Sequence, residues 1–275
     1  MIRFASPTFL FRDTAPRDLP AIMEKLAKIG FDGIELYGMH GFTSDDIRKF
    51  CRDTGLTILC DHIRYREFSR NTQRVVESRK AIGTLYLTID EIPFECLTDD
   101  GGFRETIAEI ERIAKVCRVS GIQLLYHNHG HDLTRSVSGA PVLDLILDNT
   151  DPKLLKFQPD LGWLALGGGN PLEYLQRHNR RCPVIHLKDY YADKPVLMES
   201  AFVLGNKRGG PEHNHFEFRP SGYGIMNYPA LMPAVLECQP DWITVDHDLS
   251  YERDTFQDME MSLRYIKQLI NLYSH

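Results

Sequence analysis

The feature that most constrains the fold is a regular alternation of amphipathic segments with short apolar ones. Leu19, Ile22, Met23 and Leu26 recur at helical spacing up to Gly30, and the segment FDGIELYG that follows has the pattern of a short strand. The same change of period recurs along the chain. Because parallel strands need a crossover connection, usually a helix, this alternation indicates a parallel sheet with helices packed on it.

Eight segments are predicted to form strands, and a predicted helix follows each. The strands are IRFAS, FDGIELYG, TILCDHI, TLYLTI, IQLLYHNH, KFQPD, PVIHLKD and WITVDHD. The clearest later helices are expected at residues 44–54, 70–82, 107–117, 141–148, 171–179, 228–238 and 256–270. No linker rich in Gly, Ser or Pro divides the chain. Eight such units in 275 residues predict one domain over residues 1–275, an α/β fold of the (β/α)8 TIM barrel type rather than an open doubly wound sheet.

Composition narrows the class of protein. The 43% apolar content suits a globular core, and no run of residues is long and apolar enough for a membrane helix. A net charge of −6 argues against a protein that holds nucleic acid through its phosphates. The first residues, MIRFASPTFLFRD, lack the pattern of a signal peptide, so we expect a cytoplasmic protein with no membrane or nucleic-acid partner.

One connection is unusually long. Residues 190–218 show no clear periodicity, and connections of this length are commonly lids or binding segments. The segment, which contains His213 and His215, is predicted to close over the site or to contact a neighbouring subunit.

Polar side chains gather where the later predicted strands end. In a barrel of this type the active site lies at the carboxyl ends of the strands. One imidazole or carboxylate from each of strands five to eight gives His127, Asp160, His186 and Asp246. Such a nitrogen and oxygen donor set suits one divalent ion, Mn²⁺, Co²⁺, Fe²⁺, Zn²⁺ or Mg²⁺. Any one of the four is more commonly a capping residue than a ligand, but four in successive strands predict a metal site.

Two local motifs have other interpretations. The letters HNH in YHNHGHD match the name of a nuclease motif whose residues are spread over a larger unit, so we regard the match as accidental. Lys188 has the strand-end position of some Schiff-base lysines. With His186 and Asp189 beside it, a contact to a substrate oxygen is the preferred prediction.

The segments GFDGIELYG, CDHI, LLYHNH, PDLGW, VIHLKD, RPSGYG and WITVDHD occur in the order found in the xylose-isomerase-like TIM barrel superfamily, which the chain resembles over nearly its whole length. That superfamily contains ketose 3-epimerases, inosose isomerases and dehydratases, and 3-dehydroshikimate dehydratases. The resemblance implies a metal-dependent enzyme of carbohydrate metabolism, in which many members are dimers or tetramers.

The family's metal site consists of a carboxylate, an Asp, a His and a Glu on strands five to eight. The matching positions are His127, Asp160, His186 and Asp246, and the first and last depart from the family's glutamates. These departures argue against simple 3-epimerase chemistry. Resemblance to the dehydratases implies that His129 is the base that removes a proton beside a carbonyl.

The resemblance also implies residues that meet the substrate. Glu35 matches a substrate contact and is a second acid/base candidate, although a salt bridge explains it equally well. Trp163 would offer a sugar a flat apolar face, or fill the core. His62, Lys188 and Arg219 are candidate donors to hydroxyl, carboxylate or phosphate groups.

Three functions remain open at this point. The first is a divalent-metal-dependent isomerase or epimerase of a sugar, keto-sugar or related polyol, acting through an enediolate. The second is a lyase that dehydrates a 3-keto sugar or inosose at the same site. The third is a barrel that binds sugar, or serves as a subunit, without turnover.

Overall fold

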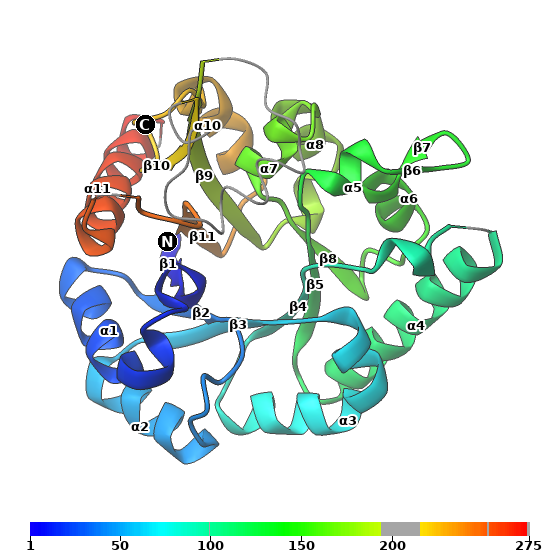
Figure 1. The fold of residues 1–275 in the computed structure, drawn as a ribbon, viewed down its shortest axis with the longest axis horizontal. Coiled ribbons are helices and arrows are strands. Elements are labelled where there is room, and N and C mark those ends of the chain that lie inside the picture. Colours follow the sequence, from blue (N-terminus) through cyan, green and yellow to red (C-terminus); the bar gives the residue numbers. More distant parts are fainter. Residues whose placement is uncertain (99, 194–214, 252, 274–275) are drawn as a thin grey trace.

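Eight parallel strands form the centre of the molecule and helices surround them, as the sequence predicts (Figure 1). The computed structural model describes residues 1–98, 100–193, 215–251 and 253–273. The eight strands are β1 (Arg3–Pro7), β2 (Gly33–Leu36), β3 (Thr57–Ile63), β4 (Tyr86–Ile89), β5 (Gln123–His127), β8 (Leu155–Gln158), β9 (Val184–Ala192) and β11 (Trp242–Asp246).

The α-helices are α1 (Ala15–Ile29), α2 (Ser44–Thr54), α3 (Tyr65–Ala81), α4 (Asp100–Val119), α5 (His131–Thr134), α6 (Val142–Asp148), α7 (Leu161–Leu166), α8 (Pro171–Arg177), α10 (Tyr228–Glu237) and α11 (Thr255–Tyr273). Three short 3₁₀ helices are η1 (Thr8–Phe11), η2 (Phe94–Cys96) and η3 (Asn179–Arg181). Local sequence fixes several ends. Thr43 and Asp46 form a capping box that begins α2, and Gly30, with φ of 104°, ends α1 in the left-handed region.

The ring of strands closes at one weak seam. Parallel ladders join each strand to its neighbour from β9 through β11, β1, β2, β3, β4 and β5 to β8. Between β8 and β9 the structure has a single parallel bridge, Asp160 to His186, in which the His186 N–H donates to the Pro159 carbonyl at 2.8 Å. The seam therefore runs between two of the predicted metal ligands.

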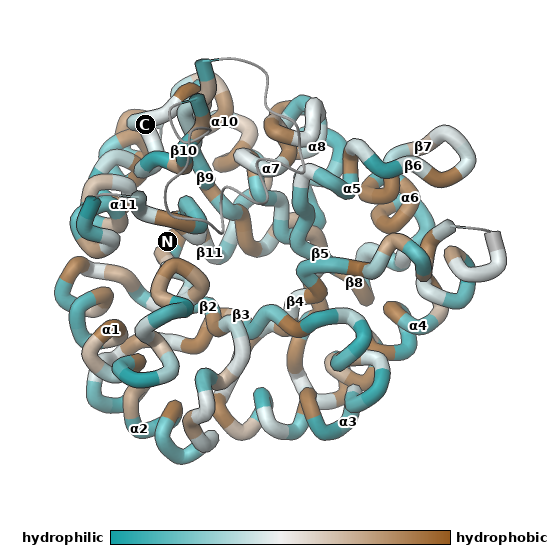
Figure 2. Tube along the Cα trace, viewed as in Figure 1, coloured by the Kyte–Doolittle hydropathy of each residue, from teal (hydrophilic) through white to brown (hydrophobic). Residues whose placement is uncertain are grey.

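Apolar burial explains why only one end of the barrel is open. The surrounding helices alternate apolar and polar residues along their length, as amphipathic helices do (Figure 2). A separate buried cluster joins Ala5, Leu125, Val184 and Trp242, which come from different sides of the ring. These side chains meet only through the barrel interior, so they fill it near the start of the strands and leave the carboxyl ends for a cavity.

The main departures from the sequence prediction lie after the strands. Residues 190–218 are not one irregular connection, because β9 continues to Ala192 and pairs antiparallel with β10 (Phe216–Arg219). A two-stranded hairpin, β6 (Ser136–Val137) and β7 (Ala140–Pro141), also precedes α6. The predicted lid falls mostly on residues 194–214, including His213, which lie outside the described residues; His215 contacts Asp193 at 3.1 Å. No helix of the described part of the chain is long and apolar enough to cross a bilayer.

Candidate metal centre

A cavity of about 650 Å³ opens at the carboxyl ends of the strands. Eight of the ten predicted site residues line it: Glu35, His62, His127, His129, Trp163, His186, Lys188 and Asp246. Asp160 is fully buried behind this lining, and Arg219 lies elsewhere on β10. The remaining lining residues include Phe9, Arg12, Tyr37, Arg64, Asp90 and Asp248, none of which the sequence singled out as site residues.

The four predicted metal ligands lie together. Donor atoms of His127, Asp160 and His186 all lie within 4.8 Å of one another, and Asp246 Oδ2 is 3.3 Å from His186 Nδ1. His127 and Asp246 are the last residues of β5 and β11, Asp160 lies between β8 and α7, and His186 lies within β9. Asp160 Oδ2 and His127 Nδ1 are buried and make no hydrogen bond within the described residues, although Asp160 Oδ2 forms an ion pair with Lys188 Nζ at 3.2 Å. Burying such polar atoms costs free energy unless they gain a partner. A divalent cation would be such a partner, and it suits this mixed set of nitrogen and oxygen donors.

The position of Asp160 is fixed from two sides. Its Oδ1 accepts the Trp163 N–H at 2.9 Å and so caps the start of α7. Asn128, fully buried on the neighbouring connection, accepts the Asp160 N–H at 2.9 Å. Gly162 allows the close approach of α7 to β9, since a Cβ there would lie 2.6 Å from the Lys188 carbonyl oxygen. These contacts leave Asp160 Oδ2 directed at the other ligands.

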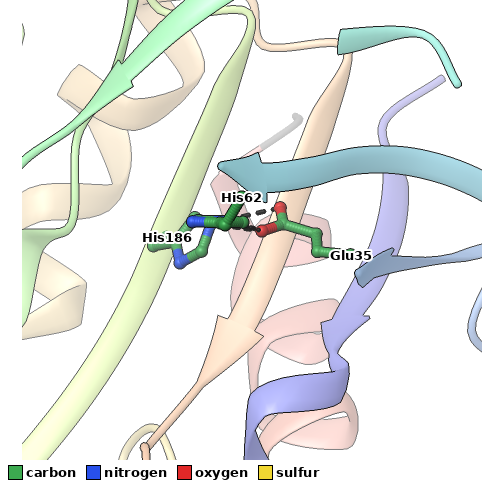
Figure 3. A group of neighbouring side chains, drawn as sticks. All are labelled: Glu35, His62 and His186. Atoms are coloured by element: carbon green, nitrogen blue, oxygen red, sulfur yellow. Dashed lines mark hydrogen bonds and ion pairs between the residues drawn. The ribbon is translucent and has the colours of Figure 1, made fainter. Parts of the chain in front are cut away.

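A second group of metal-type donors shares His186 with the first. Glu35 on β2, His62 on β3 and His186 on β9 point toward one another (Figure 3). His62 Nε2 lies 2.8 Å from Glu35 Oε2, and His186 Nε2 lies 3.0 Å from the same oxygen. Thr244 and Gln158 also donate to Glu35. Burial raises the pKa of this carboxyl, but His186 and His62 outweigh burial and hold it well below its usual value.

Charges inside the centre are paired. Lys188 Nζ lies 3.2 Å from Asp160 Oδ2, 3.0 Å from Asp246 Oδ2 and 2.7 Å from Asp248 Oδ1. Burial favours the neutral lysine, yet these carboxylates raise its pKa above the usual value. His186 faces Glu35 and Asp246, which overcome the effect of burial and raise its pKa to about 10. The metal-free centre therefore carries two cationic side chains among four acidic ones.

The two histidines of the HNH segment are kept neutral. Burial, reinforced by neighbouring cationic groups, lowers the pKa of both His127 and His129 well below the usual value. His129 Nδ1 lies 2.9 Å from the Asp90 carbonyl oxygen, which only accepts hydrogen bonds. Nδ1 therefore carries the hydrogen in the neutral ring, and Nε2 is its basic nitrogen.

Other predicted residues differ in their placement. Trp163 is 2% exposed and its ring lies 5.5 Å from that of His129, so it both lines the cavity and packs in a buried aromatic cluster with Phe218. Arg219 forms an ion pair with Glu217 and lies over the Tyr191 ring. The structure thus brings Trp163, but not Arg219, to the metal ligands.

Two residues of the centre were assigned no role from the sequence. Asp248 shares a period-two pattern with Asp246, which signals a common face, but it follows the end of β11 and has a φ of 49°. Asn128 gave no signal, because its partner Asp160 is 32 residues away. Both act through neighbours: Asp248 through Lys188, and Asn128 through the backbone of Asp160.

Comparison with known proteins finds related barrels. A family model described as xylose isomerase-like TIM barrel matches residues 23–269. An inosose dehydratase from Geobacillus kaustophilus is 32% identical over 184 residues, which are 62% of this chain and 54% of that protein. The chain spans about half the length of the curated relatives it matches.

Two solved structures share the fold at low sequence identity. A sugar phosphate isomerase/epimerase from Parabacteroides distasonis superposes with a TM-score of 0.78 at 19% identity, covering 97% of this chain and 94% of that one. A structure described as IOLI protein with a binding zinc atom gives a TM-score of 0.73 at 13% identity and covers 99% of both chains.

Proposed function

The chain belongs to the xylose isomerase-like TIM barrel family, and from this premise we propose that it is a divalent-metal-dependent isomerase or epimerase. Its substrate class is a sugar, keto-sugar or related polyol. The observation that carries the proposal is the convergence of His127, Asp160, His186 and Asp246, from four successive strand units of the barrel, beside one cavity.

These four residues would hold the ion, and a structural relative whose description names zinc supports this assignment. A divalent ion held there would act as a Lewis acid that polarises a substrate carbonyl and so makes the neighbouring C–H more acidic. The nitrogen-rich set with two aspartates suits Mn²⁺, Fe²⁺, Co²⁺ or Zn²⁺ better than Mg²⁺, which prefers oxygen ligands.

Proton transfer is assigned to His129, with Glu35 and His62 as the second acid/base group. His129 lines the cavity, and because its Nδ1 donates to the Asp90 carbonyl, Nε2 is the ring nitrogen that would accept a proton. Glu35 also lines the cavity, but its low pKa makes it a weak base in the metal-free protein. The hydrogen-bonded pair of His62 and Glu35 would return a proton through the imidazole.

The walls of the cavity suit a carbohydrate. Trp163, Phe9 and Tyr37 supply flat apolar faces for the C–H groups of a sugar, and His62 and Lys188 supply donors for its oxygens. Arg12 and Arg64 also line the cavity and add positive charge. Arg219 pairs with Glu217 and does not line the cavity, so the proposal gives it no contact with the substrate there.

The first test is the metal content of protein purified without chelator. Wild type is expected to hold about one equivalent of transition metal. Asp160→Ala should lose the metal, because a ligand carboxylate is removed, and should remain folded. Elemental analysis and circular dichroism give the two readouts. Normal metal content in Asp160→Ala would rule out the assignment of these four residues as ligands. Wild type that holds no metal after soaking with Mn²⁺, Co²⁺ and Zn²⁺ would favour a role in sugar binding or as a subunit without turnover.

The second candidate function is dehydration of an inosose or 3-keto sugar at the same site. The name inosose dehydratase of the curated relatives favours it. The first step, proton removal beside the carbonyl, is shared, and loss of a β-hydroxyl then replaces reprotonation. Mass spectrometry of products from keto-sugars and inososes separates the two, since an isomerase conserves mass and a dehydratase removes one water.

A further inference from the structure

Lys188 is a cation already resident among the acidic groups of the centre. Its side chain is 1% exposed, and its ammonium contacts three carboxylates, those of Asp160, Asp246 and Asp248. The rings of Trp163 and Phe218 lie 5.1 and 5.5 Å from the same nitrogen. One carboxylate is enough to balance the charge of one ammonium, so the group has more negative than positive charge.

Each of the two predicted ligand carboxylates has one oxygen committed elsewhere. Asp160 Oδ1 accepts the Trp163 N–H, and Asp246 Oδ1 accepts the Asp248 N–H at 3.2 Å. The remaining oxygens, Oδ2 of Asp160 and Oδ2 of Asp246, are the atoms that contact Lys188 Nζ. A metal ion that used these carboxylates would have to take the same two oxygens from the ammonium.

Asp248 offers the ammonium a place to remain. It makes the shortest of the three contacts, 2.7 Å, and is not one of the predicted ligands. Its φ of 49° is in the left-handed region, which costs energy for a residue with a side chain. Arg12 donates to the Asp248 carbonyl at 2.8 Å and helps to hold this conformation.

We infer that Lys188 is a built-in counter-ion that competes with the divalent ion for Oδ2 of Asp160 and Asp246, and that Asp248 retains the ammonium when the ion binds. This inference rests on the proposed metal site and adds its regulation. Lys188 stabilises the metal-free protein and lowers its metal affinity. Its ammonium contacts all three carboxylates without metal, and Asp248 alone when the metal is bound.

The test compares Lys188→Met, Asp248→Asn and the double variant with wild type, using chelator-treated protein. Mn²⁺ affinity is measured by calorimetry, and the melting temperature of the metal-free form by circular dichroism. Lys188→Met is expected to bind Mn²⁺ about tenfold tighter or more and to melt lower without metal, because the carboxylates lose their counter-ion. Lys156→Met, a half-buried lysine on β8, is the matched control and should leave Mn²⁺ affinity unchanged.

Asp248→Asn should weaken Mn²⁺ binding, because the ammonium then has only the ligand carboxylates as charged partners. In the Lys188→Met background the same change should have little effect, since Asp248 acts through Lys188. An equal effect in both backgrounds would mean that Asp248 acts by its charge alone, and would overturn its role as the retaining group.

The remaining outcomes separate this inference from the proposed function. Wild type that binds Mn²⁺ while Lys188→Met binds no tighter overturns the competition and leaves the metal site standing. Mn²⁺ binding by Lys188→Met alone supports the competition and rejects metal dependence of the wild type. Absence of binding in both rejects both. If Lys188→Met does not fold, unchanged or tighter Mn²⁺ binding by Asp248→Asn overturns the inference.

Discussion

Asn128 is expected to affect metal binding although its own contacts are with the backbone of Asp160. Its side chain accepts the Asp160 N–H and donates to the Asp160 carbonyl at 3.4 Å, and so joins the connections that follow β5 and β8. Asn128→Ala removes both contacts, so we expect Mn²⁺ affinity to fall about tenfold, the lower end for residues that orient ligands. Calorimetry measures the change.

A control for this effect is available on the surface. Asn149→Ala removes an exposed amide that donates to the Leu145 carbonyl at the end of α6, and should leave Mn²⁺ affinity unchanged. Equal affinities of Asn128→Ala and wild type would show that the backbone of Asp160 is held by the strands alone.

Residue identities in the centre were predictable where a strand pattern fixed the side chain's direction. Because side chains alternate along a strand, the spacing of two residues puts His127 on the same face as His129, and His186 on the same face as Lys188, and all four line the cavity. Pairing was not predictable. The sequence carries no sign that Lys188 contacts three carboxylates at once, because those partners belong to other strands and the contacts depend on barrel closure.

Among the elements, long periodic helices and strands were predicted well and short irregular ones were not. The predicted helix at 228–238 matches α10, and the predicted helix at 70–82 begins earlier, at Tyr65 in α3. The four-residue α5 and six-residue α7 are too short to show a helical period. The α7 helix is nevertheless central to the site, because its cap is Asp160.

The end of α8 carries a histidine that makes stability depend on pH. His178 is 9% exposed and packs against the Phe157 ring; burial and the nearby charges of Arg177 and Arg181 lower its pKa to about 4. The unfolded chain takes up this proton near pH 6.5, so the contribution of His178 is complete above pH 6.5 and is lost as the pH falls toward 4.

His178→Phe keeps the ring and cannot bind a proton. Its free energy of unfolding should therefore decrease less than that of wild type between pH 6.5 and 4.5. Urea titrations at several pH values measure the free energy of unfolding of both proteins. The difference between the two values cancels the contributions of the other buried histidines. Parallel pH profiles would contradict the assignment of this site.

At the scale of the whole molecule, the seam between β8 and β9 is where metal should alter dynamics. Asp160 and His186 lie on opposite sides of it and are joined by one bridge, whereas the other neighbours in the ring share full ladders. An ion held by both residues would link the two strands. We expect Mn²⁺ to slow amide hydrogen exchange at residues 155–160 and 184–188 more than along β2 and β3.

Hydrogen exchange followed by mass spectrometry, with and without Mn²⁺, resolves these segments. Asp160→Ala serves as the control, because it keeps the strands and loses a ligand. Equal slowing across all strands would show a global stabilisation instead of a local link at the seam.

The antiparallel pairing of β9 with β10 gives the barrel a place to accept new sequence. Asp193 and His215 are joined by a backbone hydrogen bond of 3.3 Å, so the chain leaves this pair and returns to it at one point. Because the two ends are held together by the hairpin, a longer insertion between them need not change the ring of strands. The entropic cost of closing a loop also rises only slowly with its length. Evolution, or a protein engineer, could therefore exchange the sequence inserted at this hairpin while the eight parallel strands stay unchanged.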